Sequence, residues 1–376
     1  MRIEAVIVFA GFAVLLGAVE GKEPVQESRL QWGQLPPLPD MEGFAGMFAG
    51  VSNGSLIAAG GANFPAARVW EGGKKEWYDS IYVLDKPTGK WRMANERLPR
   101  SLAYGGSASW NDAVICAGGS DGQRHFDTVF ALRLVNDHVQ IEPLPSLPEP
   151  CADMCCGLVG SQFYIAGGTK RPGDTTAMHT FWRLDLAEPK DQLRWEILKP
   201  WPGPERSHAV AAVLDESFFV MSGFRWEPDL KGDAVRTVPF LSDAYRYTPR
   251  GKAEGLWQRV SDLPRAVGAA PSPAMTFAGS KIAVIGGTDD TIGNLEARTH
   301  PGFLPDVFVY DSIADQWTLP EKMPVGASRV TAPSATWHDQ YIVINGERAP
   351  GRRSPDVYTV RLNSSPHNEQ EKPPGK

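Results

Sequence analysis

The sequence is short of the residues and patterns that mark several classes of protein. Its 376 residues include only four cysteines and seven histidines, and the histidines are scattered without the spacing of a metal site. It contains no long amphipathic helical pattern and no extended basic run. With a formal net charge of -6, the chain lacks the basic surface that drives nucleic-acid binding, and we expect little helix.

Glycine, proline and tryptophan are abundant. The chain has 38 Gly, 32 Pro and 12 Trp, a composition that indicates many short strands joined by tight turns. Its length and its hydrophobic content of 42% are enough for one large all-β domain or for two smaller domains. Composition leaves both arrangements open, so the internal pattern of the chain has to decide between them.

The two ends of the chain differ from its middle. An apolar run extends from about Ala5 to Ala18, and a polar stretch begins near Glu20. This pattern predicts a signal peptide over residues 1–21, with an uncleaved anchor as the alternative. The run is too short to cross a bilayer comfortably, so we expect an exported protein, periplasmic or else secreted, with no stable membrane span after cleavage. The polar tail, residues 364–376, is expected to be disordered.

The four cysteines are Cys116, Cys151, Cys155 and Cys156. In an oxidising compartment one disulfide is an alternative to consider. We expect small buried thiols instead, because Cys155 and Cys156 lie in an apolar strand pattern in which neighbouring side chains face opposite sides.

An apolar strand that ends in a pair of small residues occurs six times. The six copies read SLIAAGG, AVICAGG, QFYIAGG, SFFVMSG, KIAVIGG and QYIVING. Their last glycines are Gly61, Gly119, Gly168, Gly223, Gly287 and Gly346, between 49 and 64 residues apart. Kelch repeats have a similar period of about 50 residues, and each repeat forms one blade of a β-propeller.

Each copy is preceded by one apolar strand and followed by a third, and four copies are then followed by a tryptophan strand, at Trp91, Trp195, Trp257 and Trp317. The sixth repeat lacks this last strand, but the segment around Trp32 matches it. We therefore predict an all-β fold, a six-bladed kelch-type β-propeller over residues 28–363, whose ring is closed by the N-terminal strand.

The small pairs are predicted to be structural. Glycine permits the close approach and unusual backbone angles of a crowded strand end. None of the pairs precedes a helix, as a phosphate-binding glycine loop would require.

Antiparallel strands bring the start of each innermost strand and the end of the second strand to the same rim of the channel. The first set of rim residues, taken as candidate substrate-binding residues, is Phe44, Arg100, Tyr104, Arg206, His208 and Arg329. The second set is Asn63, Arg68, Arg124, His125, Lys170, Arg171, Arg225, Trp226, Glu347, Arg348, Arg352 and Arg353. Most charged members are basic, which favours an anionic ligand. The alternative is that these cations face solvent or pair with acidic residues such as Asp121, Asp289 and Asp290.

The segment INGERAPGRRSPDVY carries the candidate catalytic pair. Glu347 directly follows the last small pair, and Arg353 lies six residues later, across a turn that contains Pro350 and Gly351. On spacing alone, a carboxylate beside a guanidinium is more often a simple salt bridge than a catalytic pair.

The chain resembles the kelch-propeller sialic acid mutarotases, also called N-acetylneuraminate epimerases, and in particular a cyclically permuted branch of them. The resemblance runs from about Leu30 to Leu362. It is carried by GFAGMFAGVSNGSLIAAGGANF, RSLAYGGSASWNDAVICAGG and NGERAPGRR. In the bacterial epimerases the segment like NGERAPGRR comes first, an order that a closed ring tolerates. The resemblance implies that Glu347 is the acid/base and that Arg353 binds substrate.

The implied activity is the interconversion of the α and β anomers of N-acetylneuraminate through an open-chain ketone. This reaction needs only proton transfers, so the resemblance implies an isomerase with a small acidic sugar as its partner and no cofactor or metal. Arg353 would then bind the sugar carboxylate through two parallel hydrogen bonds. Oligomeric state is left open by the sequence.

Three other functions are alternatives to a mutarotase. A non-enzymatic kelch propeller that binds a protein or a glycan is the main alternative, because propellers host many functions. A sialidase is disfavoured because its repeated S-x-D-x-G-x-T-W turn is absent. A kelch-type copper-radical oxidase is also disfavoured, because no tyrosine and histidine metal set can be assembled from the sequence.

Overall fold

The computed structural model describes residues 30–228, 235–251, 253–293, 295–318 and 321–363. The predicted signal peptide and the predicted disordered tail lie outside these residues. Within them, no helix has both the length and the apolar character needed to cross a membrane. The one helical element of this part of the chain is a 3₁₀ turn, η1 (Val69–Glu71).

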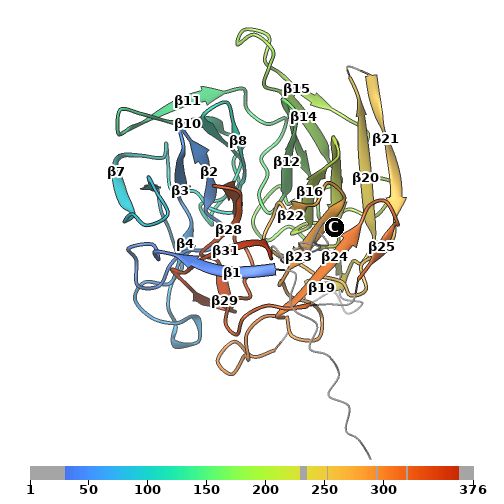
Figure 1. Ribbon diagram of the computed structural model, residues 1–376. Coiled ribbons are helices and arrows are strands. Elements are labelled where there is room, and N and C mark those ends of the chain that lie inside the picture. The colour runs from blue at the N-terminus through green and yellow to red at the C-terminus, as the bar shows by residue number, and fades with distance from the viewer. Residues whose placement is uncertain (1–29, 229–234, 252, 294, 319–320, 364–376) are drawn as a thin grey trace, which may run out of the picture.

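Four-stranded antiparallel sheets, the blades, are arranged around a central axis, as Figure 1 shows. In the described residues there are six, of which blade 5 has a fifth, short strand. Each blade is built from the innermost strand outwards, except that the outermost strand of blade 6 is the first described strand of the chain. Blade 1 is β2 (Phe48–Ser52), β3 (Ser55–Ala59), β6 (Ser80–Leu84) and β7 (Arg92–Arg97). Blade 2 is β8 (Gly106–Trp110), β9 (Ala113–Ala117), β10 (Val129–Val135) and β11 (His138–Leu144). Blade 3 is β12 (Cys155–Val159), β13 (Gln162–Ala166), β14 (Phe181–Asp185) and β15 (Trp195–Ile197).

The second half of the ring repeats this plan. Blade 4 is β16 (Val210–Leu214), β17 (Ser217–Met221), β20 (Ala244–Arg250) and β21 (Ala253–Val260). Blade 5 is β22 (Met275–Phe277), β23 (Lys281–Ile285), β24 (Asp306–Asp311) and β25 (Gln316–Trp317), with β26 (Glu321–Lys322) also paired to β24. Blade 6 is β27 (Ser334–Trp337), β28 (Gln340–Ile344), β31 (Val357–Leu362) and β1 (Leu30–Leu35).

The first described strand closes the ring, as the sequence predicts. β1 pairs antiparallel with β31, and the register runs from Leu30 opposite Leu362 to Leu35 opposite Val357. Figure 1 shows the two strands, from opposite ends of the chain, side by side. Because β1 completes blade 6, the outermost strand of the last blade comes from the first part of the chain.

Three short hairpins lie between the second and third strands of their blades and were not predicted. They are β4 (Ala62–Asn63) with β5 (Glu76–Trp77), β18 (Phe224–Pro228) with β19 (Val235–Phe240), and β29 (Glu347–Ala349) with β30 (Arg352–Arg353). Each begins directly after one of the small pairs, so each stands at the same mouth of the channel.

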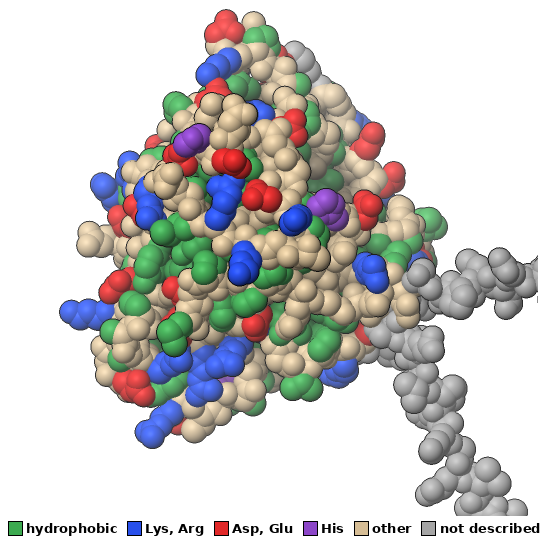
Figure 2. Space-filling view, turned by 60° about the vertical axis from the view of Figure 1, so that its left-hand side comes forward, with side chains coloured by type: hydrophobic (Ala, Val, Ile, Leu, Met, Phe, Trp, Pro, Cys, Tyr) green, Lys and Arg blue, Asp and Glu red, His purple; other side chains and the backbone are tan. Residues whose placement is uncertain are grey.

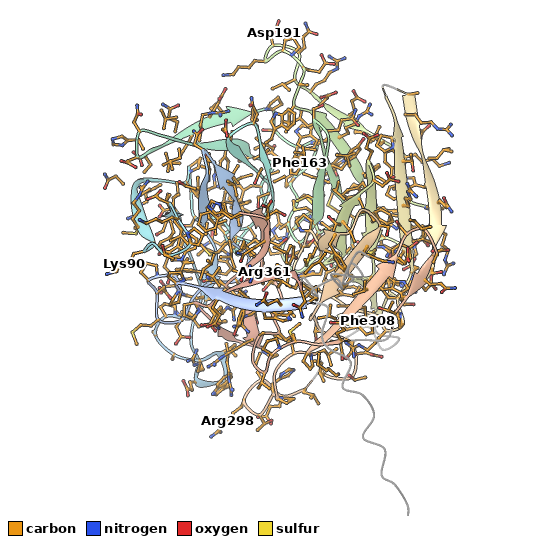
Figure 3. The ribbon with its side chains drawn as sticks, viewed as in Figure 1. Lys90, Phe163, Asp191, Arg298, Phe308 and Arg361 are labelled. Carbon is orange, nitrogen blue, oxygen red and sulfur yellow. The ribbon has the colours of Figure 1, made fainter. Side chains whose placement is uncertain are left out.

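The core consists of six apolar clusters, one between each pair of neighbouring blades. Between blades 1 and 2, for example, Phe48 and Phe130 meet edge to face, with ring centroids 6.0 Å apart. Figure 3 shows Phe163 and Phe308 among the blades, whereas Lys90, Asp191 and Arg298 lie at the outer margin. Burial is therefore distributed around the ring and leaves the axis free for a channel.

Tryptophans of the outermost strands connect blades 3, 4 and 5 to the blade before each of them. The indole N–H of Trp195 donates to the carbonyl of Pro145 in blade 2, and that of Trp257 donates to Lys199 after blade 3. Trp317 donates in the same way to Ser261 after blade 4. These bonds explain why tryptophan recurs at this position of the repeat.

The small pairs have the structural role that we predicted. The first glycine of the pair in blade 1, Gly60, has φ +68°, and a Cβ there would lie 2.3 Å from the carbonyl oxygen of Leu102 in blade 2. In blade 6 this position is Asn345, which keeps a positive φ of 56°. Its side-chain oxygen accepts a hydrogen bond from the N–H of Phe44 in blade 1, in addition to the 2.8 Å backbone bond from the N–H of Gly346 to the carbonyl of Phe44.

Candidate functional site at the channel mouth

A closed ring of backbone hydrogen bonds surrounds the channel. Its members stand shortly before the six innermost strands and are Gly46, Tyr104, Asp153, His208, Ala269 and Thr331. Each has φ between 51° and 67°, and each N–H donates over 2.7–2.9 Å to the carbonyl of the equivalent residue in the preceding blade. A left-handed backbone costs about 1–3 kcal/mol in a non-glycine residue, so the surrounding bonds must hold it. The ring encloses a throat cavity of about 90 Å³.

A second layer of equivalent positions lies directly beside this ring. It consists of the residues that follow the small pairs, Ala62, Ser120, Thr169, Phe224, Thr288 and Glu347. Each forms a short antiparallel bridge with the residue before its blade's ring member, as Glu347 does with Val330. Because the backbones of the six positions are alike, the side chains alone decide what each wall of the mouth offers. Blade 6 supplies the one carboxylate of this layer.

Glu347 is held in the β29–β30 hairpin. Its Oε1 lies 2.8 Å from Nη2 of Arg353, directly opposite it in the hairpin, and its Oε2 accepts a hydrogen bond of 3.3 Å from the N–H of Gly351. The side chain of Glu347 is 16% exposed and that of Arg353 only 2%. The carboxylate is therefore fixed on one side by the protein and open to the channel mouth on the other.

Arg353 lies behind Glu347. Its guanidinium stacks on Phe64 at 4.7 Å, and its Nε donates to the carbonyl of Ala62 over 3.4 Å. Its Nη1 is buried without a hydrogen-bond acceptor among the described residues. In this arrangement Arg353 positions the carboxylate of Glu347, and its own side chain does not line the cavities at this mouth.

Two adjoining cavities open at the mouth. The larger, of about 420 Å³, is lined by Lys75, Trp77, Tyr104, Ser120, Gly122, His125, Asp153, Thr169, Arg171, Pro172, Gly173, Asp174, His208, Trp226, Thr331 and Glu347. The smaller, of about 220 Å³, shares His208, Thr331 and Glu347 with it and adds aromatic side chains, among them Phe224 and Phe240. Together they form a polar hollow with one apolar wall, a shape suited to a polar small molecule.

A chain of polar side chains runs along the wall formed by blades 2 to 4. Nε2 of His125 lies 3.1 Å from Oγ1 of Thr169, which donates over 3.1 Å to Oδ2 of Asp153. Oδ1 of Asp153 lies 3.3 Å from Nε2 of His208. Burial lowers the pKa of His125, which favours the neutral imidazole.

Cationic groups of this cavity come from the loops above the ring. Nζ of Lys75 donates over 3.0 Å to the hydroxyl of Tyr104 and lies 4.9 Å from the centroid of its ring. Arg171 is exposed and pairs with Asp174. Figure 2 shows acidic and basic side chains interspersed over the face that it presents, so a preference for anions has to arise within the cavity.

The structure separates the first set of predicted rim residues into two groups. Tyr104 and His208 line the larger cavity. Phe44 is buried between blades 6 and 1, and Arg100 is exposed beside the ring of Phe126. These last two side chains line neither cavity at the mouth.

Arg206 and Arg329 are internal structural groups in this arrangement. Arg206 has a fully buried side chain and pairs with Asp243 over 2.7 Å, and Arg329 pairs with Asp356 over 2.9 Å. Each reaches from the start of its innermost strand to the beginning of the third strand of the same blade. Several rim cations are therefore neutralised within the fold, although not by the acidic partners that the sequence suggested.

Asp153 and Lys75 are the functional candidates that the sequence analysis missed. Asp153 occupies the same repeat position as Tyr104 and His208, so an alignment of the six strand starts contains the signal. Lys75 carries no such signal, because the β4–β5 hairpin that places it at the mouth was not predicted.

All four cysteines are free and buried, which confirms the expectation of buried thiols. Burial raises the pKa of Cys156 to about 12. No group of three or more potential metal ligands occurs in the ranges that the structure covers.

Comparison with known proteins addresses the first third of the chain. Residues 17–141 match the family model described as N-acetylneuraminate epimerase. Over these residues the chain is similar to the N-acetylneuraminate epimerases. The epimerase of Haemophilus influenzae (strain PittEE) is 36% identical over 128 residues, which cover 30% of this chain and 33% of that protein. The epimerase of Escherichia coli (strain K12) is 39% identical over 101 residues, 24% of this chain and 27% of that protein.

The matched segments thus span about a third of these epimerases. They include the segments that begin at Gly43 and Arg100, but residues 17–141 stop well before Glu347. The solved structure titled "Structure of YjhT" has a TM-score of 0.65 and covers 88% of this chain and 98% of its own, with 14% sequence identity. That likeness supports the propeller fold. The cyclic permutation relative to the epimerases stays a prediction.

Proposed function

We propose that this protein is a mutarotase that interconverts the α and β anomers of N-acetylneuraminate. The observation that carries the proposal is the carboxylate of Glu347, which is held by Arg353 and Gly351 and faces a cavity large enough for a sugar. The relationship of the first third of the chain to the epimerases supports the same substrate.

The reaction needs a group that moves protons at the anomeric centre. The anomeric hydroxyl gives its proton to the carboxylate of Glu347, the bond between the anomeric carbon and the ring oxygen breaks, and the ring oxygen takes a proton. Rotation about the adjacent bond exposes the other face of the ketone, and reclosure returns both protons. Because the sugar also opens without a catalyst, a positioned acid/base group can supply the needed acceleration.

Recognition of the sugar's own carboxylate is assigned to the cavity cations. Lys75 lies on the cavity wall, and its ammonium can donate to an anion while it keeps its contact with Tyr104. Arg353, which the resemblance implies as the substrate's partner, lies behind Glu347. Its contribution in this arrangement is to hold the catalytic carboxylate in place.

The test is proton NMR of freshly released N-acetylneuraminate with purified protein. The wild type should accelerate the conversion of α to β anomer, and Glu347→Gln should lose about 100-fold or more of that acceleration while it keeps the fold. Glu149→Gln is the matched control, because Glu149 is also in an ion pair, with Lys170, but lies outside the cavity. Wild-type protein without any acceleration would favour the non-enzymatic propeller instead. A fully active Glu347→Gln would show that Glu347 is not the acid/base.

Export to the periplasm is part of the proposal. Its support is the apolar run within residues 1–21, which is typical of a signal peptide. Expression of the full chain in a Gram-negative host, followed by fractionation and N-terminal sequencing, tests it. A mature protein that begins near residue 22 in the periplasmic fraction is expected, and an intact N-terminus in the cytoplasm would refute export.

A further inference from the structure

Asp153 faces the same cavity as Glu347, from the opposite side of the ring. It belongs to blade 3 and Glu347 to blade 6, and in a closed ring of six blades these two are diametrically opposed. The side chain of Asp153 is 19% exposed, close to the 16% of Glu347. A sugar bound in the mouth would therefore have one carboxyl group on each side.

The protein fixes Asp153 as firmly as it fixes Glu347. Its backbone belongs to the closed ring, where its N–H donates to Tyr104 and its carbonyl accepts from His208. Its two carboxyl oxygens contact Thr169 and His208, at 3.1 and 3.3 Å. His208 is itself held by stacking on Phe224, with ring centroids 4.7 Å apart. Such double support is typical of a group whose exact direction matters for chemistry.

The contact between Asp153 and His208 has a chemical consequence. A carboxyl group and an imidazole at this distance can share one proton, which either partner can hold. Glu347 has no comparable partner, because the guanidinium of Arg353 can only donate. The two sides of the cavity therefore differ. Glu347 in blade 6 can accept a proton, whereas the contact between Asp153 in blade 3 and His208 in blade 4 can hold one.

We infer that the Asp153–His208 pair is the second proton-transfer group of the site and works opposite Glu347. The inference rests on the proposed function. In ring opening, Glu347 accepts the proton of the anomeric hydroxyl. Asp153 passes the shared proton to the ring oxygen, which takes the electron pair of the breaking C–O bond as the ketone forms. On reclosure at the other face, the former ring oxygen attacks the ketone and returns its proton to Asp153, while Glu347 gives its proton to the new anomeric oxygen, so no proton is gained or lost. Asp153 is the catalytic residue and His208 the positioning residue.

Other titratable groups also face this pair and enter its pH dependence. Those that line the cavity are Lys75, Tyr104, His125, Arg171, Asp174 and Glu347. The wild type should show a bell-shaped dependence of kcat on pH, because Glu347 must be ionised and the pair must hold its proton.

The test compares three variants after subtraction of the spontaneous rate. Asp153→Asn should lower kcat about 100-fold with little change in KM and should remove the alkaline limb of the profile. His208→Gln should lower kcat less than Asp153→Asn does and should change the alkaline limb, because the pair has lost one of its two members. Asp339→Asn is the matched control. Asp339 also has a left-handed backbone, with φ 57°, but lies at the opposite mouth.

The outcomes separate this inference from the proposed function. If Asp153→Asn keeps the wild-type kcat and pH profile while Glu347→Gln is inactive, the inference is wrong and the function stands. If the wild type does not accelerate mutarotation, the proposed function itself is wrong, whatever the variants show. A lowered kcat with an unchanged pH profile would also overturn the inference, because a purely structural role would give that result. Asparagine tolerates a left-handed backbone, so Asp153→Asn should fold.

Discussion

Substitution of Arg206 by methionine decides whether this arginine serves the fold or the ligand. Its Nη2 donates to Oδ2 of Asp243 over 2.7 Å, and its Nη1 donates to the carbonyl of Ser222 over 3.0 Å. The guanidinium also lies 5.4 Å from the ring of Trp201. Every polar contact of this side chain is thus inside blade 4 or at its edge.

The size of the effect follows from burial. The side chain of Arg206 is 0% exposed and that of Asp243 is 12% exposed, so solvent cannot replace the lost partner well. Removal of one member of a buried ion pair typically costs about 3–5 kcal/mol. We expect the lower part of that range, because the hydroxyl of Tyr245 still donates to Asp243 over 2.7 Å in the variant.

The assay is urea unfolding followed by tryptophan fluorescence, with mutarotation kinetics on the same samples. Arg206→Met should unfold at a clearly lower urea concentration, while KM stays within about twofold of the wild type under conditions where both proteins are folded. Arg361→Met serves as the control, because Arg361 is exposed and contacts only Gln31 among the contacts described. A variant as stable as the wild type, with a raised KM, would show that the guanidinium contacts the sugar.

Two further predictions concern charges that the structure places differently. Lys75→Met should raise KM for N-acetylneuraminate about 10-fold or more at nearly unchanged kcat, because a charge-assisted hydrogen bond is worth about 1.5–3 kcal/mol; steady-state kinetics would contradict the assignment if KM did not change. At Asp306, burial alone would raise the pKa, but hydrogen bonds from Lys322 and Arg265 outweigh it and hold the pKa below its ordinary value. A depressed pKa stabilises the fold above the ordinary aspartate value of about 3.9, and this contribution is lost as pH falls through the lower, folded-state pKa. The difference in unfolding free energy between wild type and Asp306→Asn should therefore be largest near pH 7 and shrink in that acid range, and a pH-independent difference would refute the reasoning.

The fold could be predicted from the sequence because its signal is repeated. Six small pairs mark the ends of six second strands, and the lone Trp32 segment matches the strand missing from the last repeat. Both features reflect backbone geometry that every blade shares. A pattern that occurs six times in one chain needs no alignment to be recognised.

The site could be predicted only in part, because sequence shows charge but not its partner. Arg206 and Arg329 stand at rim positions, yet each finds an aspartate 37 or 27 residues later in its own blade. Asp153 was overlooked because a single acidic residue in the segment CADMCC has no local pattern, and its meaning comes from the ring that places it opposite Glu347. The roles of Glu347 and Arg353 stay predictions, now with a geometry in which the arginine supports the glutamate.

The ring of backbone hydrogen bonds narrows the channel, so the cavities at the mouth are closed at their inner end to a molecule as large as a sugar. About 90 Å³ is room for a few water molecules, so a ligand must depart by the opening through which it arrived. For the proposed mutarotase, product would have to leave through this opening before the next substrate enters, and a ligand that blocks the opening would stop turnover. The opposite opening, near Asp339 and Arg361, can be used to attach the protein to a surface or a dye without blocking the entry and exit of ligand.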